Sequence, residues 1–349
     1  MLDSFVTTNT DTSYRRRFPI THALKWVNYE FELYFRSIAG RAYVEAPVEG
    51  YYHCRNSFVY EAKHIFSDGA FDSLSVIDFS DHELLCEYVK NRIQTGAYDL
   101  PASGQRLDVL FCKAGAGNYG HFLTECAPRL LNLQGQALGP LRLHMPVEAA
   151  NYASLITALC NFLGLDVELR IGNTADLVYL ERFIYLSSIS SHNTKKSRTF
   201  SKFRDVILAM LGVQQTYSRR FAIKRGHNEQ RKVSNWDDLT PHLSKLGYEC
   251  IQPGKLTFKE QVSLFASADR IFGSLGAGFT NCMWAGSECM PLMLDPGLAD
   301  FFFWDISGQL CQQFHWQFCG VAQPWSLELA TTDFAAPVDL TLQVLDQLQ

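Results

Sequence analysis

The stretch IFGSLGAGFTN, residues 271–281, decides the fold predicted for this chain. The segment DRIF, residues 269–272, leads into this stretch and predicts a strand. The segment FTNCMWAG, residues 279–286, follows the glycines and predicts the start of a helix. Gly273, Gly276 and Gly278 keep side chains out of the turn between them, so backbone N–H groups can approach a ligand there. The start of a helix adds a partial positive charge. The stretch therefore predicts a binding loop for a phosphate or a diphosphate.

The segments around this loop repeat one alternation of strand and helix. Strands are predicted at residues 219–225, 248–253, 269–274 and 290–296, with helices at 236–247 and 258–268. Asn235 is interpreted as the N-cap of the first helix, and Thr257 and Glu260 have capping-box spacing ahead of the second. This alternation predicts a doubly wound α/β domain with a parallel sheet.

The same alternation begins at residue 106 in the first half of the chain. Strands are predicted at residues 106–114, 141–147, 166–172 and 178–187, with helices at 121–133 and 150–164. We therefore predict two Rossmann-like domains facing a central cleft, with ligands at the carboxyl ends of the strands.

The predicted boundary between these domains follows residue 212. The first domain, residues 1–212, includes an extension over residues 1–105 in which the only clear pattern is a helix predicted at residues 81–93. Residues 187–201 are polar and are interpreted as a linker or mobile loop. The second domain is residues 213–349, and its aromatic tail, residues 298–349, is expected to cross back to the first domain.

Composition excludes several classes of protein. The net charge of −5 argues against a nucleic-acid binder held by a basic field. The ten cysteines form no CxxC pair, which predicts reduced thiols rather than a zinc site. No run of 18 apolar residues and no apolar signal core occurs, so a cytoplasmic protein without a membrane span is expected. Residues 15–38 are basic and then aromatic, which leaves open peripheral membrane contact or a helix packed on its domain.

Two arginines are the first candidates for the diphosphate site. Arg225 ends a predicted strand, and Arg231 follows it after a polar turn. Two guanidinium groups beside backbone N–H donors can neutralise a diphosphate, although both could also be ordinary exposed loop charges. Thr280 and Asn281, just inside the predicted helix, could bond phosphate or sugar hydroxyls, or the local backbone. No paired acidic motif stands beside the loop, so no divalent metal is predicted.

A second candidate group lies in the segment GAGNYGHFLTECAPRL, residues 115–130. His121 and Glu125 are four residues apart and therefore lie on one face of a predicted helix. They could act as a base and its orienting partner, or the carboxylate could act directly. The alternative is a helix-start glutamate and a histidine satisfied by packing.

Two separated segments resemble glycosyltransferase family 61. The first is NYGHFLTECAPRL, and the second runs from KRGHNEQRKVSNWDDL through the glycine loop to LMLDP. The resemblance implies a GT-B architecture, with a nucleotide-sugar donor in the C-terminal domain and the acceptor mainly in the N-terminal one. It also implies an inverting reaction that needs no metal or other cofactor. By this similarity Arg225, Arg231, Gly276, Ala277, Gly278, Thr280 and Asn281 hold the diphosphate, whereas Asn118, Tyr119, His121 and Glu125 face the acceptor. The chain departs from the family at Leu275, where a histidine is usual.

The function expected from these features is metal-independent, inverting transfer of a hexosyl or pentosyl group. The donor would be a nucleoside diphosphate sugar, with a UDP-sugar favoured, and the acceptor a hydroxyl of a glycan or glycolipid in surface or capsular polysaccharide synthesis. Glu125, aided by His121, would remove the acceptor proton. Two alternatives stay open: a catalytically silent nucleotide-sugar-binding partner subunit, suggested by Leu275, and another GT-B-like transferase such as a pyruvyltransferase.

Overall fold

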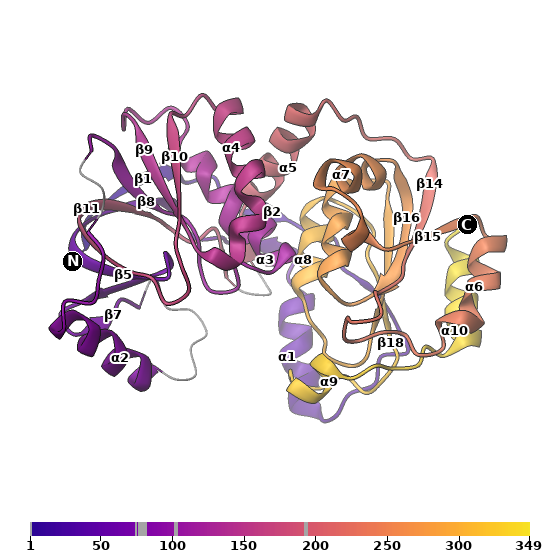
Figure 1. Ribbon diagram of the computed structural model, residues 1–349. Helices are drawn as coiled ribbons and strands as arrows, with labels where there is room; N and C mark the ends of the chain where they lie inside the picture. The colour runs from indigo at the N-terminus through magenta and orange to yellow at the C-terminus, as the bar shows by residue number, and fades with distance from the viewer. Residues whose placement is uncertain (1, 74, 76–81, 101–103, 192–194) are drawn as a thin grey trace. The chain divides into compact units, whose positions relative to one another are not determined.

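The computed structural model describes residues 2–73, 75, 82–100, 104–191 and 195–349 (Figure 1). The chain folds into two compact units, each assembled from more than one segment. Unit 1 comprises Met1–Thr12 and Ala46–Ser190, and unit 2 comprises Ser13–Glu45 and Ser191–Gln349. Sequence analysis placed the boundary after residue 212 and left residues 13–45 in the first domain. The structure instead assigns these residues and helix α5 to unit 2. The linker predicted at 187–201 falls partly outside the described residues.

Unit 1 is built on one sheet with the strand order β10-β9-β8-β11-β5-β6-β7, and β1 also pairs with β5. The first four strands of this order run parallel, as the alternation predicted. From β5 onward the pairing is antiparallel, so the sheet is mixed and only its parallel half is Rossmann-like. The strands of this sheet are β1 (Leu2–Asn9), β5 (Glu49–Tyr60), β6 (His64–Ser67), β7 (Ala70–Phe71), β8 (Leu107–Leu110), β9 (Leu141–Met145), β10 (Val167–Ile171) and β11 (Leu177–Leu186).

The helices of unit 1 cover the buried faces of this sheet. On the antiparallel half, Val89 of α2 packs into a cluster with Tyr60, Phe66 and Leu177. The helix predicted at 121–133 forms, but as three short pieces of different pitch. The helical elements are α2 (His82–Gln94), α3 (Tyr119–His121), the π-helix η1 (Phe122–Cys126), the 3₁₀ helices η2 (Ala127–Leu133) and η3 (Val147–Tyr152), and α4 (Ala153–Phe162).

Unit 2 contains a six-stranded sheet in the order β15-β14-β16-β17-β18-β3, and every described pair is parallel. The chain passes from β14 outward to β15 and then returns to the opposite side of β14 to form β16. The order therefore reverses between β14 and β16, which is where doubly wound sheets bind ligands. The strands are β3 (Ile20–His22), β14 (Arg219–Ile223), β15 (Tyr248–Ile251), β16 (Ala268–Ser274), β17 (Met290–Asp295) and β18 (His315–Phe318).

Helices cover both faces of this sheet, with α6 and α10 on one side and α7 and α8 on the other (Figure 1). The doubly wound arrangement predicted for the second half is therefore confirmed. The tail, residues 298–349, was expected to cross back to the first domain, and this is wrong. It forms α8, β18, α9 and α10 within unit 2, where β18 pairs with β17. The helical elements are α1 (Tyr29–Ala39), α5 (Arg198–Leu211), α6 (Trp236–Lys245), η4 (Pro253–Lys255), α7 (Phe258–Ala266), η5 (Ala277–Trp284), α8 (Phe302–Gln309), α9 (Leu327–Thr331) and α10 (Val338–Gln347).

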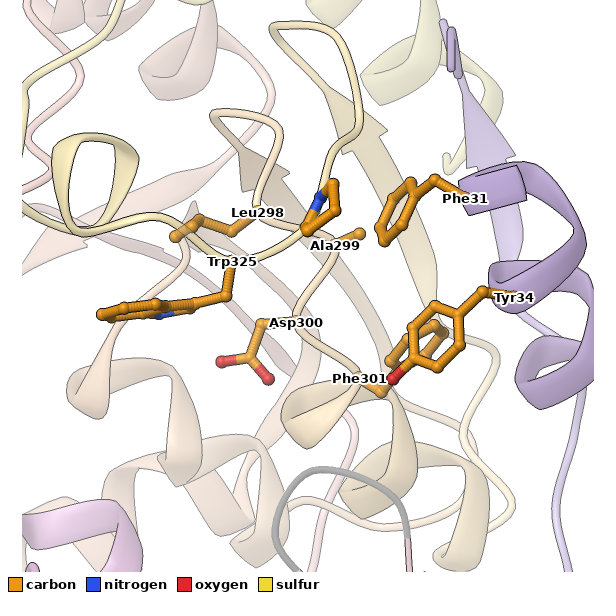
Figure 2. Close-up of a pocket in the computed structure, with 8 residues that line it drawn as sticks. Phe31, Tyr34, Leu298, Ala299, Asp300, Phe301 and Trp325 are labelled. Atoms are coloured by element: carbon orange, nitrogen blue, oxygen red, sulfur yellow. The ribbon is translucent and has the colours of Figure 1, made fainter. Parts of the chain in front are cut away.

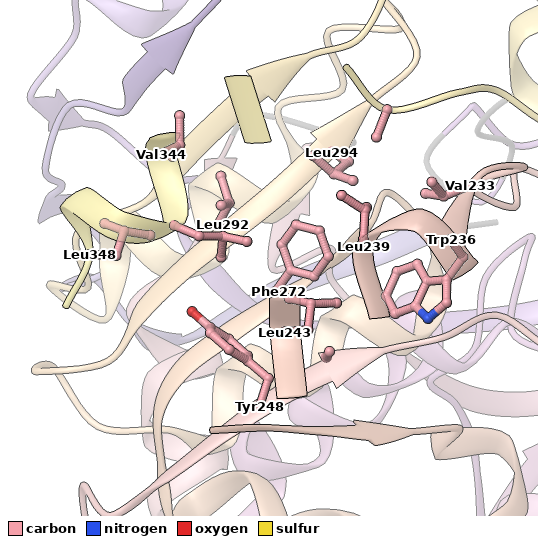
Figure 3. Packing of buried hydrophobic residues seen from close by; sticks show 13 residues of the cluster. Val233, Trp236, Leu239, Leu243, Tyr248, Phe272, Leu292, Leu294, Val344 and Leu348 are labelled. Carbon is pink, nitrogen blue, oxygen red and sulfur yellow. The ribbon is translucent and has the colours of Figure 1, made fainter. Parts of the chain in front are cut away.

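The α6 and α10 side of the sheet is sealed by a cluster of apolar side chains (Figure 3). Helix α6 contributes Trp236 and Leu239, strand β16 contributes Phe272, and α10 contributes Val344. Burial of such side chains stabilises the fold by roughly 1.5–3 kcal/mol each. This cluster holds β16 in place, and the glycine loop begins where β16 ends.

The two predicted caps differ in outcome. The capping box ahead of α7 is confirmed, because Thr257 and Glu260 each bond the other's backbone N–H. Asn235 stands at the N-cap position of α6, but its side chain makes no cap hydrogen bond. Its amide instead donates to Ala336 O at 2.9 Å and accepts from Ala336 N at 2.8 Å. The predicted capping role is therefore wrong, and Asn235 joins α6 to the segment before α10.

Residues 13–45 are held in unit 2 by hydrogen bonds and by packing. Strand β3 pairs with β18, and the short strand β2 (Tyr14–Arg15) pairs with β4 (Tyr43–Val44). Elsewhere in the chain, β12 (Ser190–Ser191) pairs with β13 (Lys195–Lys196). Phe31 and Phe35 of α1 are buried, so the helix expected in this region packs on its unit. Within the described part of the chain, no helix is long and apolar enough to span a bilayer.

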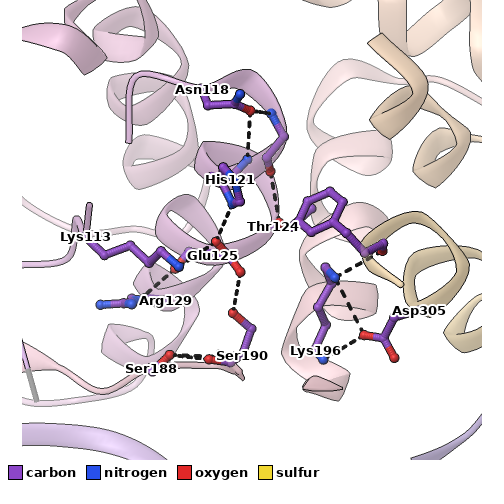
Figure 4. A network of polar contacts seen from close by, with 12 residues as sticks. Lys113, Asn118, His121, Thr124, Glu125, Arg129, Ser188, Ser190, Lys196 and Asp305 are labelled. Carbon is purple, nitrogen blue, oxygen red and sulfur yellow. Dashed lines mark hydrogen bonds and ion pairs between the residues drawn. The ribbon is translucent and has the colours of Figure 1, made fainter. Parts of the chain in front are cut away.

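A buried carboxylate completes this attachment. Asp305 Oδ1 accepts hydrogen bonds from Tyr14 at 2.5 Å and from Arg16 Nη1 at 2.7 Å. Asp305 Oδ2 accepts from Lys196 N at 2.9 Å (Figure 4). Burial, followed by the Asp305 charge, raises the pKa of Tyr14 well above its ordinary value. Asp305 therefore ties the β2 segment and the chain before α5 to helix α8.

We expect Asp305→Asn to destabilise the protein, because it leaves the buried Arg16 charge without its carboxylate. Breaking a buried ion pair on one side costs about 3–5 kcal/mol. Urea denaturation followed by circular dichroism measures the loss. The control is Asp237→Asn, since the Asp237 side chain is 94% exposed. An Asp305 variant that unfolds at the wild-type urea concentration would contradict this account.

Candidate functional site

Two predicted diphosphate-binding elements meet where the strand order of unit 2 reverses. Arg225 follows the end of β14, and Gly276 follows the end of the neighbouring strand β16. A Cβ built on Gly276 would lie 1.5 Å from Arg225 Nη1. The same Nη1 donates to Leu275 O at 3.0 Å. Glycine is therefore required at 276 because the Arg225 guanidinium rests directly on the loop backbone.

Arg231 lies close enough to Arg225 for their charges to interact. Burial, and then the charge of Arg231, lower the pKa of Arg225. Burial also lowers the pKa of Arg231, against the opposing effect of the Asp300 and Asp295 carboxylates. Within the residues described, the buried Nε atoms of both arginines have no hydrogen-bond partner, although Glu229 Oε2 lies 3.3 Å from Arg225 Nε. Two partly buried guanidinium groups with unused donors form a site that favours an anion.

The segment after the loop differs from the prediction. It is a 3₁₀ helix, η5, rather than an α-helix. Phe279 N closes its first turn by donating to Gly276 O at 2.8 Å. A 3₁₀ helix has poorer hydrogen-bond geometry than an α-helix, so we assign the attraction for an anion mainly to the guanidinium groups. Ala277 and Gly278 begin η5, and both are partly exposed.

Thr280 and Asn281 point into the protein rather than toward a ligand. Both residues are fully buried. Asn281 Nδ2 donates to Gln261 at 2.9 Å and to Gly278 O at 3.0 Å, and its Oδ1 accepts from Trp284. The Asn281 side chain therefore braces η5, and the geometry does not support the predicted ligand contact. Thr280 Oγ1 is buried without a hydrogen-bond partner among the described residues, so it is not placed on the open side of the loop either.

In unit 1, Glu125 is the centre of a buried polar network (Figure 4). Its Oε2 lies 2.8 Å from Lys113 Nζ and 2.8 Å from His121 Nδ1. Its Oε1 accepts a hydrogen bond from Ser190 Oγ at 2.9 Å. The predicted His121–Glu125 pairing is therefore present as a direct contact, and it forms across the turn where α3 passes into the π-helix η1. Single π-helical turns are frequent at functional sites.

The side chains of Glu125 and His121 differ in how far they are exposed to solvent. The Glu125 side chain is 0% exposed, whereas that of His121 is 25% exposed. In the neutral form of the ring, a carboxylate at Nδ1 favours the tautomer that carries its proton on Nδ1. The imidazole is therefore the member of the pair that a substrate can reach. Asn118 accepts hydrogen bonds from Gly120 N and His121 N and so caps α3, while Tyr119 is partly exposed beside it.

Sequence analysis missed two members of this network, Lys113 and Ser190. Lys113 follows β8 closely and Ser190 follows β11, and these two strands are parallel neighbours in the sheet. Their position near the carboxyl ends of predicted strands was the available signal, because parallel strands present ligand-binding groups there. Across the described residues, no group of three or more His, Cys, Asp or Glu side chains could hold a metal ion.

Comparison with known proteins identifies one family. The model of Glycosyltransferase 61 matches residues 119–291, which include His121, Glu125, both arginines and the glycine loop. No curated protein matches the chain. The matched segment spans parts of both units.

The contact between Arg225 and Gly276 generates a prediction for anion binding. Gly276→Ala places a methyl group where Nη1 lies, so the guanidinium must leave the loop. We expect roughly tenfold weaker binding of inorganic pyrophosphate, because a hydrogen bond to a charged group contributes about 1.5–3 kcal/mol. Calorimetric titration measures the change. Gly278→Ala is the matched control, since a Cβ there would lie 3.5 Å from Ile223 Cγ2, an ordinary van der Waals contact. Equal affinities for wild type and both variants would show that Arg225 does not hold the anion.

Proposed function

We propose that this chain, which belongs to glycosyltransferase family 61, moves a sugar from a nucleoside diphosphate sugar to a hydroxyl of a glycan acceptor. Membership in the family makes the chain a glycosyltransferase. The observation that carries the finer proposal is the Arg225 guanidinium against Gly276, with Arg231 close enough for their charges to interact, at the point where the strand order of unit 2 reverses. A diphosphate leaving group matches the charge and the unused donors found there.

The guanidinium pair is proposed to stabilise the leaving group. As the bond from the anomeric carbon to the diphosphate oxygen breaks, that oxygen gains negative charge. Arg225 and Arg231 meet this charge with donors that are already fixed by the fold and partly shielded from water. Each such donor lowers the barrier by about 2.7–4 kcal/mol where charge develops in the transition state. Two arginines can in this way do the work of a divalent cation, which supports metal-independent chemistry.

The proposed base is His121, with Glu125 as its positioning residue. The acceptor oxygen forms its bond to the anomeric carbon, the diphosphate leaves with the electrons of the breaking bond, and the acceptor proton passes to His121 Nε2. Attack opposite to the leaving group inverts the anomeric centre. Glu125 holds the imidazole orientation and stabilises the imidazolium that forms. A positioned base of this kind typically supplies 10²–10⁴-fold in rate, about 3–5 kcal/mol.

This assignment exchanges the roles expected from the sequence, where Glu125 was to take the proton. Burial argues against that role, because the Glu125 carboxylate is enclosed. Lys113, His121 and Ser190 already occupy its two oxygens. These fixed contacts leave the enclosed carboxylate poorly placed to take a proton from an acceptor. It is well suited to orienting a histidine.

A catalytically silent nucleotide-sugar-binding subunit remains the second candidate. Leu275 favours it, because this buried side chain stands where the family usually has a histidine and is only 1% exposed. Its backbone nevertheless still serves the site, since Leu275 O receives the Arg225 hydrogen bond. Nucleotide binding without donor hydrolysis or transfer would favour the silent subunit. A pyruvyltransferase would differ from both in not requiring a nucleoside diphosphate.

The roles of the pair predict different kinetics for two variants. We expect His121→Ala to lower kcat for donor hydrolysis or transfer by about 10²–10⁴-fold. Glu125→Gln should lower kcat less, because Nε2 keeps its lone pair, and it should change the pH–rate profile. KM for the donor should stay near the wild-type value in both. Thermal melting monitors folding, and the exposed His227 provides the control variant His227→Ala. Near-normal turnover in His121→Ala, with none in a folded Glu125→Gln, would make the carboxylate the base.

Metal independence predicts the response to chelation. Exhaustive dialysis against EDTA, followed by the same assay, should leave kcat and donor KM unchanged because the arginines neutralise the leaving group. Adding Mg²⁺ or Mn²⁺ back to the dialysed enzyme should give no gain. Loss of activity on chelation that either cation restores would refute this part of the proposal.

A further inference from the structure

Unit 2 also contains a pocket of about 350 Å³ that is lined largely by aromatic side chains (Figure 2). Phe31 and Tyr34 of α1 form one wall, and Trp325 lies across the pocket from them. The carboxylate of Asp300 stands between the Trp325 and Tyr34 rings. All four residues lie outside the segment that matches the family model. The pocket is therefore a feature of this chain to which the family match assigns no role.

The walls of the pocket are fixed by the surrounding fold. Asp295, at the end of β17, accepts hydrogen bonds from Gly297 N at 2.8 Å and Leu298 N at 2.7 Å through Oδ1, and from Trp316 through Oδ2. On the opposite wall, Phe35 packs α1 against Phe301 with ring centroids 5.0 Å apart. These contacts set the course of residues 297–301 before any ligand arrives. A preformed pocket loses little entropy on binding.

The pocket adjoins the guanidinium pair electrostatically. The carboxylate of Asp300 lies near enough to Arg231 to oppose the lowering of its pKa. Asp300 also follows β17, which is the direct neighbour of β16, the strand that leads into the glycine loop. Asp300 and the glycine loop thus follow the carboxyl ends of two adjacent parallel strands, at one edge of the sheet. Asp300 Oδ1 accepts from Phe302 N at 3.0 Å, which fixes the carboxylate at the start of α8.

We propose that this pocket binds the nucleoside half of the donor. The planar base stacks on the exposed aromatic surface of Trp325 and Tyr34, and Asp300 accepts hydrogen bonds from the ribose hydroxyls. Base–aromatic stacking and a carboxylate on the ribose diol are the interactions that these side chain types provide. The volume suits a nucleoside, since small-molecule pockets begin at about 300 Å³. The inference rests on the proposed function, because it takes the guanidinium pair as the diphosphate site.

Calorimetry with two probes distinguishes binding in the pocket from binding at the diphosphate site. UDP carries both groups, whereas inorganic pyrophosphate carries the phosphates alone. We expect Trp325→Ala to weaken UDP binding by about tenfold or more, the effect of losing one base–aromatic stack, with pyrophosphate affinity unchanged. Asp300→Asn should also weaken UDP alone, whereas Arg231→Gln should weaken both probes. Trp325 is 65% exposed, so its truncation should leave folding intact. Leu327→Ala, at a neighbouring residue with 67% exposure, is the matched control.

The outcomes distinguish failure of this inference from failure of the proposed function. If wild type binds UDP, and both Trp325→Ala and Asp300→Asn bind it equally well, the pocket does not hold the nucleoside. If those variants lose affinity for a UDP-sugar but keep it for UDP, the pocket holds the sugar half instead, and the inference is also overturned. If wild type binds pyrophosphate but none of UDP, GDP, ADP and CDP, the nucleotide donor itself is ruled out and both proposals fall.

Discussion

The burial of two arginines beside one glycine is the constraint on which the candidate donor site depends. Burial lowers the pKa of each guanidinium, and the nearby charge of Arg231 lowers the pKa of Arg225 further. The fold tolerates the pair because Arg225 reaches the Leu275 carbonyl over a residue without a side chain. It also places the Asp295 and Asp300 carboxylates near Arg231. Part of the positive charge of the two guanidinium groups remains uncompensated. An anionic ligand would be attracted by this remaining charge.

The position of this pair follows from the topology of the unit 2 sheet. The chain leaves β14 toward β15 and leaves β16 toward β17, in opposite directions, so the two loops diverge and open a space at the carboxyl edge. The apolar cluster of α6, β16 and α10 holds one face of that edge rigid. Asp305 attaches residues 13–45 to the same unit, and through them supplies α1 and the wall of the aromatic pocket. The proposed nucleoside site thus depends on a segment more than 200 residues away from the glycine loop in sequence.

In the His121–Glu125 pair, burial determines which side chain is accessible to a substrate. Helical spacing brings the two side chains together but does not say which of them meets the substrate. Lys113 and Ser190 enclose Glu125, so the imidazole is the more exposed side chain of the pair. Both added residues follow strands of the parallel half of the sheet, so the network forms only once β8 and β11 have paired.

Local pattern determined a large part of this protein. Strand and helix alternation predicted the parallel half of unit 1 and the doubly wound sheet of unit 2, because hydrophobic period and capping are properties of short segments. Local pattern also predicted the glycine loop, the two arginines and the contact between His121 and Glu125. Only the tertiary structure decided the rest. The antiparallel half of unit 1, the β3 strand of unit 2, the Asn235–Ala336 bonds and the inward direction of Asn281 all depend on partners distant in sequence. Periodicity describes which face of a segment is buried, but long-range pairing and desolvation determine what it is buried against.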